Sequence, residues 1–461
     1  MKTSSHCMLE SCLETSQRVQ TVQVEVALDH PLLLLKRALP WGAITEVMTR
    51  HWRESGKNVD GGPGLPWDTS LYVPLVVLML VKAYDSRQME AYVAENVVAR
   101  LFIGRYATVQ AQIRDHSNIA RAYAALGKAG IEAVNQLIVK EAHGLGFVDA
   151  GSLSADTTAQ ELPIGSPNEP GILRGLAQRC GRALARLKER GIPGLGDALD
   201  QAQTIVRSVK EHHLFTRDKA DKRQVLIRIL TEVGELMVQT RPLVKRLESS
   251  SDQVIQSACS RLLAMQEVIK PLMGQIVQWI STGKVAANKI VHVGIPQARA
   301  IVRNKTGKKT EFGLAYLINR LGGGYLFGTR IEANADEKQM PLRALAEYRA
   351  IFGQEATPEL MVYDRGGDST RTREQLALEG VPQVGIQPKG KRPWSVAEAV
   401  RDQIRSERGR TEGSIGILKS DRYKFNKPKE RLWHTLEMAG PRSILSFNLN
   451  KFMRDVVALV S

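Results

Sequence analysis

The sequence predicts an α/β fold: a mixed sheet with flanking helices, a helical amino-terminal domain, and a long all-helical insertion between the first and second strands. Two patterns predict the sheet, namely an apolar run that ends in an acid and a glycine pair at 360–368, and two apolar alternations separated by glycines 322–324. Helical periodicity over 169–289, between strand-rich segments, predicts the insertion.

Length and charge restrict the class of protein. A chain of 461 residues is longer than a single hydrophobic core usually supports, so two or three domains are expected. Lys and Arg total 64 against 48 Asp and Glu, a formal net charge of +16. This excess suits a polyanion, because each neutralised phosphate releases counterions, although a basic protein without such a partner has the same composition. Aromatic residues are only 5% of the chain, which argues against a base-stacking single-strand binder.

Cysteine usage and hydropathy predict a cytoplasmic protein without a membrane partner. The four cysteines lack the paired spacing of a zinc or disulfide framework. His6, Cys7 and Cys12 have metal-ligand chemistry, but a disordered terminus is the simpler interpretation. The most apolar stretch, Leu71 to Val81, is shorter than the roughly 20 residues that span a bilayer, so it is expected to be a core helix. The first twenty residues show no export signal.

Residues 1–29 are expected to be disordered and residues 30–144 to form the helical domain. Its arginines suit a helix-turn-helix DNA reader, but a plain helical scaffold fits the pattern equally well. Apolar periodicity predicts helices over Pro31–Leu39, Trp41–Trp52, Leu71–Tyr84, Met89–Phe102, Ser117–Leu126 and Ile131–His143.

The sheet domain is expected to comprise residues 145–168 and 290–461, with 169–289 inserted. Small and β-branched residues predict a first strand that ends at Asp156. The charged surface of the insertion indicates a solvated bundle or, alternatively, a phosphate-facing surface. Its predicted helices are Leu173–Arg190, Leu195–Val209, Lys222–Leu247 and Val254–Ile280.

After the insertion, the apolar run Leu360–Tyr363 carries Asp364 to the carboxyl end of a strand, where open α/β sheets place their ligands. In this order Asp156 belongs to the first strand and Asp364 to the fourth. The alternative role for Asp364 is to cap the helix that follows. The other elements expected here are a hairpin of strands 309–318 and 325–331, helices Pro341–Phe352 and Ser369–Leu378, and a strand Val381–Ile386.

A third acid, Glu412, lies between Arg408 and Lys419 on a predicted helix that Gly409 and Gly413 interrupt. Residues four and seven apart share a helical face, so two cations bracket this acid on one stripe. Taken alone, the pattern is that of an ordinary surface ion-pair helix.

Together, Asp156, Asp364 and Glu412 offer oxygen ligands for two Mg²⁺ or Mn²⁺ ions. Such ions activate a water or hydroxyl and stabilise the leaving oxygen of a phosphodiester. The neighbouring cations would hold the phosphates, and they are Arg408, Arg410 and Lys419.

These motifs resemble those of bacterial insertion-sequence transposases of the Asp-Asp-Glu type, whose catalytic domain is ribonuclease H-like. Asp156-Thr-Thr resembles the first acid of that family, and Asp364-Arg-Gly-Gly-Asp-Ser resembles the second. Arg408-x-x-x-Glu412, with Lys419 seven residues later, matches the Arg, Glu and Lys of its Tyr-Arg-Glu-Lys signature. Arg405 replaces the Tyr, and the family's insertion usually lies elsewhere, between the second acid and the Glu.

The resemblance implies a transposase that cleaves transposon ends with water and then joins the freed 3′-hydroxyl to target DNA. Asp156, Asp364 and Glu412 would be the catalytic, metal-binding triad. The amino-terminal helices would recognise terminal inverted repeats, and a homodimer would act in a synaptic complex in the bacterial cytoplasm, at the nucleoid. The cations expected on DNA phosphates are Arg408, Arg410, Lys419, Arg365, Lys389, Lys391 and Arg392, with Lys424, Lys427 and Lys429 nearby.

Two rival functions are left open: a non-catalytic basic DNA-binding protein, and a metal-dependent nuclease on the same fold that never joins strands. Two other acids, Asp149 and Asp368, lie near Asp156 and Asp364 in sequence and rank below them, and Glu407 lies five residues before Glu412.

Overall fold

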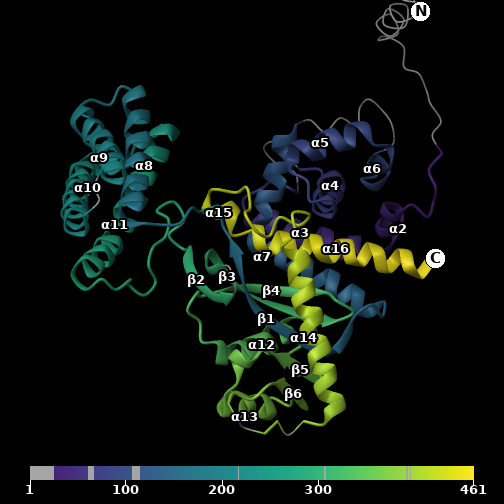
Figure 1. Cartoon of the computed structure of the whole chain (residues 1–461). Coiled ribbons are helices and arrows are strands. Elements are labelled where there is room, and N and C mark those ends of the chain that lie inside the picture. The colour runs from purple at the N-terminus through teal and green to yellow at the C-terminus, as the bar shows by residue number, and fades with distance from the viewer. Residues whose placement is uncertain are drawn as a thin grey trace, which may run out of the picture.

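The computed structural model describes residues 25–60, 67–105, 115–215, 218–305, 308–390, 393–394 and 396–460. Over these ranges the chain forms one mixed open sheet of six strands with flanking helices (Figure 1), so the predicted α/β class is confirmed. The strands run in the order β2-β3-β1-β5-β6, and β4 also pairs with β3. Their bounds are β1 Asp149–Glu161, β2 Arg299–Lys305, β3 Lys308–Gly322, β4 Leu326–Ile331, β5 Leu360–Tyr363 and β6 Gln383–Ile386.

The amino-terminal helices agree with the apolar periodicity except at two breaks. The segment predicted as one helix from Met89 is two helices, because the Asn96 side chain accepts from Ala99 N at 2.8 Å and begins a new one. The two helices predicted after 116 form one element that is kinked at Gly127, where φ is 62°. The bounds are α2 Pro31–Ala38, α3 Trp41–Glu54, α4 Thr69–Lys82, α5 Ser86–Glu95, α6 Val97–Phe102 and α7 His116–Gly144.

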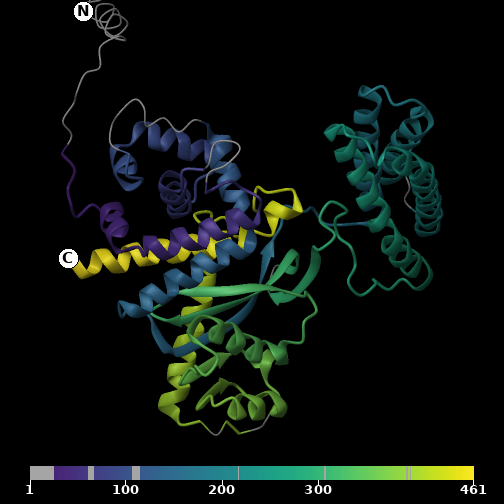
Figure 2. The ribbon, with the colours of Figure 1, turned by 180° about the vertical axis from the view of Figure 1, so that it is seen from behind.

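A long terminal helix, α16 (Ala439–Val460), lies between these helices and the sheet (Figures 1 and 2), and the sequence analysis did not predict it. Its polar side chains bond to backbone on both sides. Asn450 Nδ2 donates to Val81 O at 2.7 Å, and Asn448 Nδ2 donates to Leu326 O at 2.6 Å. The amino-terminal helices and one face of the sheet therefore share one continuous apolar core.

The insertion is a bundle of four helices that stands to one side of the sheet in Figures 1 and 2. It has an apolar core of its own, which includes the buried free thiols Cys180 and Cys259. His6, Cys7 and Cys12 lie outside the described residues. The helices are α8 Glu169–Glu189, α9 Gly196–Phe215, α10 Lys219–Leu247 and α11 Gln253–Thr282.

The sheet domain differs from the prediction in three ways. Strand β1 does not end at Asp156 but continues to Glu161, because β3 pairs with it as far as Gly313. Strand β2, which has a polar and basic sequence, was not predicted, so Asp364 follows the fifth strand and not the fourth. The remaining elements are turns η3 Glu337–Gln339 and η4 Arg365–Gly367, and helices α12 Met340–Phe352, α13 Thr370–Leu378, α14 Glu398–Leu418 and α15 Trp433–Leu436.

The third difference concerns α14, which Gly409 and Gly413 do not interrupt. A Cβ atom at either position would meet no atom within 4 Å, so both glycines face open space. Each costs about 1 kcal/mol relative to alanine in an exposed helix, which the docking of α14 on the sheet offsets.

Within the described ranges, no single helix has the length and apolar composition needed to cross a membrane. Helices α4 and α5 meet those criteria only as a pair, with a bend of 103° between them. Residues Val73 to Val81 of α4 are buried, as expected for a core helix.

We expect Asn448→Ala to lower the free energy of unfolding by about 2–4 kcal/mol, because it leaves the buried N–H of Leu326 without its acceptor and opens a small cavity. Leu326 N lies 2.9 Å from Asn448 Oδ1. Urea unfolding followed by circular dichroism measures the change. Arg454→Ala, at an exposed position of the same helix, should stay within about 0.5 kcal/mol. Equal stabilities of the two variants would contradict this account.

Candidate active site

Strand pairing places Asp156 beside Asp364. The parallel strands β1 and β5 pair from Ser152 opposite Leu360 to Ser154 opposite Val362. Two residues further along the same register, Asp156 comes next to Asp364. Since side chains alternate along a strand, the two acids project to the same face as Ser154 and Val362. Asp364 is the first residue after β5, so it stands at the carboxyl end of that strand as predicted.

Helix α14 lies across this face and brings the third acid. Thr411 Oγ1 donates to Ser154 Oγ at 2.8 Å, and Glu412 is the next residue of the helix. This bond joins the strand that carries Asp156 to the helix that carries Glu412. The bond therefore fixes how α14 is rotated about its own axis at the point where Glu412 faces β1.

A buried ion pair fixes the same helix one turn earlier. Arg320 on β3 donates from Nη1 to Glu407 Oε2 at 2.7 Å and from Nε to Ser414 Oγ at 3.3 Å. The side chains of Arg320 and Glu407 are 9% and 8% exposed. Glu407 is therefore a docking residue of α14, five residues before the candidate site acid Glu412.

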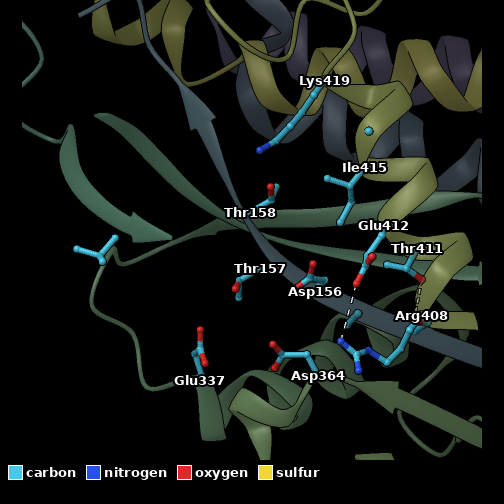
Figure 3. A pocket seen from close by; sticks show the side chains of 14 residues that line it. Asp156, Thr157, Thr158, Glu337, Asp364, Arg408, Thr411, Glu412, Ile415 and Lys419 are labelled. Atoms are coloured by element: carbon cyan, nitrogen blue, oxygen red, sulfur yellow. Dashed lines mark hydrogen bonds and ion pairs between the residues drawn. The ribbon is translucent and has the colours of Figure 1, made fainter. Parts of the chain in front are cut away.

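The three predicted acids line one open cavity of about 530 Å³. Figure 3 shows the carboxyl groups of Asp156 and Asp364 from the sheet side and that of Glu412 from α14 pointing into it. Arg408 and Lys419 line it as well, from the same helix. The remaining lining residues are Ser154, Ala155, Thr157, Thr158, Val302, Glu337, Thr411, Ile415 and Gly416.

The cavity is negatively charged. Of the described residues that line it, four are acidic and two are basic, a formal charge of −2. Burial raises the pKa of the Tyr363 hydroxyl, and the neighbouring carboxylates of Asp364, Asp156 and Glu337 raise it further. Glu412 is exposed, and its Oε1 lies 3.8 Å from Arg408 Nη2. The arrangement thus favours a cation among the acids and an anion at the cations.

Glu337, the fourth acid, was missed by the sequence analysis. It begins the turn before α12 and reaches the cavity over the Asp364 loop. Gly366 makes room for it, since a Cβ atom at that position would lie 2.0 Å from Glu337 Oε2. In the sequence Glu337 is a loop acid that follows no strand, so no pattern distinguished it.

The helix-cap alternative for Asp364 is wrong for α13, because Ser369 caps that helix by accepting from Thr372 N at 3.0 Å. Asp364 Oδ1 instead accepts from Gly366 N at 2.6 Å within the one-turn helix η4. The loop therefore holds one oxygen of Asp364 in place while the residue lines the cavity.

The other acids weighed against the triad lie outside the cavity. The fully buried side chain of Asp368 pairs with Arg373 Nε at 3.0 Å and accepts from Lys389 N at 2.7 Å, so it shapes the loop. Asp149 begins β1 and accepts from Gly151 N at 2.9 Å.

Several predicted phosphate-binding cations are not among the residues that line the cavity. Arg410 pairs with Glu407 at 2.7 Å. Arg365 is exposed on η4, and Lys389 Nζ donates to Gly366 O at 3.1 Å. Arg405 pairs with Asp402 at 2.7 Å on the exposed side of α14.

Basic residues further along the chain lie elsewhere or outside the described ranges. Lys424 Nζ donates to Ala83 O at 2.7 Å, and Lys429 Nζ lies 4.0 Å from Asp85 Oδ2, so both reach the amino-terminal helices. Lys427 N donates to Glu161 O at 2.6 Å, next to the end of β1. Lys391 and Arg392 lie outside the described residues.

The cavity acids are more widely spaced than one tight ligand cluster. Among the described residues, a group with ligand atoms within 4.8 Å of one another occurs at Glu90, Asp115 and His116, on the amino-terminal helices. There His116 Nδ1 lies 2.7 Å from Asp115 Oδ1 and 3.4 Å from Glu90 Oε2. The imidazole is thus already a partner of both carboxylates. In the cavity, repulsion between carboxylates favours wider spacing.

No family model matches the chain, and no curated protein or solved structure shows significant similarity to it.

The structure predicts opposite roles for the two glutamates of α14. Glu407→Ala should lower the free energy of unfolding by about 3 kcal/mol, because it leaves Arg320 buried without its partner. Glu412→Ala removes an exposed side chain and should change it by less than about 0.5 kcal/mol. Urea unfolding of both variants measures the difference. A comparable loss in Glu412→Ala would mean that this acid also has a structural role.

Proposed function

We propose that this chain is a DNA transposase of the Asp-Asp-Glu type. Asp156, Asp364 and Glu412 would hold divalent ions, and the chain would cleave DNA at transposon ends and join the 3′-hydroxyl to target DNA. The observation that carries the proposal is that these acids, chosen from motif spacing, line one cavity together with Arg408 and Lys419.

The donors at the cavity fit Mg²⁺ or Mn²⁺. Its described lining residues offer carboxylates and hydroxyls and include no His or Cys, a set of hard oxygen donors. Thr158 Oγ1 is buried there and has no hydrogen-bond partner among the described residues. When bound, two such ions would activate a water or hydroxyl and stabilise the leaving oxygen of a phosphodiester. Asp156, Asp364 and Glu412 would hold them, with Glu337 as a further oxygen donor.

The residues of the chain would divide the remaining work. Asp156 lies within β1, where it pairs with Ile318 of β3, and Asp364 directly follows β5, so the two acids form the rigid side of the site. Glu412 is 66% exposed and paired only loosely with Arg408, so it can adjust to a ligand. Arg408 offers a planar donor for a phosphate, and Lys419 offers a point charge at the other end of the cavity (Figure 3).

The net charge of +16 supports a polyanionic substrate, because phosphate neutralisation by Lys and Arg supplies most of non-specific DNA affinity. In this proposal helices α2–α7 recognise the terminal inverted repeats, and a homodimer brings two transposon ends together.

Each of Asp156→Asn, Asp364→Asn and Glu412→Gln should reduce Mn²⁺-dependent cleavage of DNA that carries the transposon ends by at least about a hundredfold. The reason is that metal stabilisation of the transition state is worth several kcal/mol. Gel assays of cleavage, and of strand transfer with pre-cleaved ends, measure the loss. DNA affinity in the absence of divalent ions should not fall.

Asp402→Asn is the matched control, because it removes one exposed carboxylate from the same helix outside the cavity. It should retain full cleavage. Full cleavage by all three triad variants would show that these acids are not catalytic, and absence of cleavage by the wild type would leave a non-catalytic DNA-binding protein. Cleavage without any joined product would indicate the nuclease.

A further inference from the structure

A second cavity, of about 970 Å³, lies between the helical insertion and the sheet domain, and we call it the arginine groove. Helices α8 and α11 form one wall, and the segment 288–299 with α15 forms the other. The side chains that matter here are Arg179, Arg182 and Arg186 on α8, Arg261 on α11, Arg299 at the start of β2, and Trp433 on α15.

The charge of the arginine groove is not neutralised within the described chain. It contains five arginines and one acid, Glu267, which pairs with Lys270 at 2.7 Å. The side chains of Arg182, Arg186 and Arg261 form no hydrogen bond or ion pair to another described residue. Burial lowers the pKa of Arg179, and the positive charges of Arg182 and Arg261 lower it further. Like charges are therefore gathered here at a cost that an anion would offset.

The position of Arg179 is built into the backbone. A Cβ atom at residue 294 would lie 1.9 Å from Arg179 Nη2, so Gly294 is what allows the guanidinium to pack against this segment. Nearby, His292 Nδ1 is buried without a partner among the described residues, and burial, followed by the charges of Arg179 and Arg431, lowers the pKa of His292. An imidazole carries no negative charge, so His292 does not balance the arginines.

Trp433, on α15, lines the opposite wall of the groove. Arg330 lies over the Trp433 ring, with 5.0 Å between its Cζ and the ring centroid. Arg330 is not among the residues that line the groove, and its guanidinium adds positive charge at the Trp433 ring.

Strand β2 connects the arginine groove to the candidate active site. Arg299 lines the groove and Val302 lines the acidic cavity. Three residues of strand span about 10 Å, and side chains alternate along a strand, so Arg299 and Val302 project to opposite faces of β2 and the two sites lie on either side of this edge strand.

We propose that the arginine groove binds the sugar-phosphate backbone of the DNA whose neighbouring segment enters the acidic cavity. The proposal rests on the proposed function and assigns the insertion a part in it. A phosphate backbone fits better than an acidic protein segment because its charges are regularly spaced and continuous from one site to the next.

The test compares two variants of the full chain. Arg182→Gln, Arg186→Gln and Arg261→Gln together remove three exposed cations of the groove. Arg223→Gln, Arg241→Gln and Arg246→Gln together remove three exposed cations of α10 in the same bundle, away from the groove. The two variants have the same net charge. Thermal melts followed by circular dichroism verify that both remain folded.

Fluorescence anisotropy with a labelled duplex of mixed sequence, in EDTA over a range of salt, measures affinity without cleavage. The groove variant should bind at least about tenfold more weakly than the wild type. The slope of log K against log salt should become shallower by roughly one for each arginine lost. The α10 variant should stay within about twofold of the wild type.

Equal losses in both variants would overturn the inference, because they would reflect net charge alone. Unchanged affinity of the groove variant would also overturn it, and would point to a different anion, such as an acidic protein segment. The two proposals fail separately. Unchanged affinity with cleavage still lost in Asp364→Asn removes only the groove, whereas cleavage retained in Asp364→Asn removes the proposed function.

Discussion

The parallel pairing of β1 with β5 is the contact on which the candidate site depends. It runs over three residue pairs, yet β5 is buried throughout, so its apolar side chains specify the register. A slip of one residue would turn Asp364 to the other face of the sheet, away from α14. The long helical insertion follows β1 and precedes β2. It does not disturb this pairing, because the bundle buries its apolar side chains in a core of its own.

Helix α14 completes the site because one side of it is docked on the sheet and another side faces the cavity. Five residues separate Glu407 from Glu412, which corresponds to a rotation of about 140° around the helix. Glu407 therefore faces Arg320 on the sheet while Glu412 lines the cavity. A buried ion pair is expensive to desolvate and contributes little net stability. Its value here is orientation, since it places the stripe of Arg408, Glu412 and Lys419 along the cavity.

Periodicity and strand ends allowed much of this to be predicted. The apolar stripes predicted the helices of the insertion, and the acid after an apolar run predicted where Asp364 lies. The patterns failed where burial does not follow from local sequence. Helix α16 is buried around most of its surface, with polar residues such as Asn448 and Asn450 bonded to distant backbone, so it shows no single apolar stripe.

The missed parts of the two sites have the same origin. Strand β2 is too polar to be recognised, although it separates the acidic cavity from the arginine groove. Glu337 and Gly294 gain their importance from residues far away in sequence, Asp364 and Arg179, that only the fold brings near. The spacing of Arg408 and Glu412 could be found because both lie on one helix.

Iron-dependent hydroxyl-radical cleavage of the protein backbone tests the central claim most directly, namely that three distant acids hold shared divalent ions. Fe²⁺ bound in place of Mg²⁺, with peroxide and ascorbate, cuts the chain near the ion, and mass spectrometry locates the cuts. We expect cuts near 154–158, 362–366 and 410–414 that excess Mg²⁺ and Asp364→Asn both suppress. Cuts confined to the segments around Glu90 and His116, or a pattern indifferent to Mg²⁺, would contradict the account.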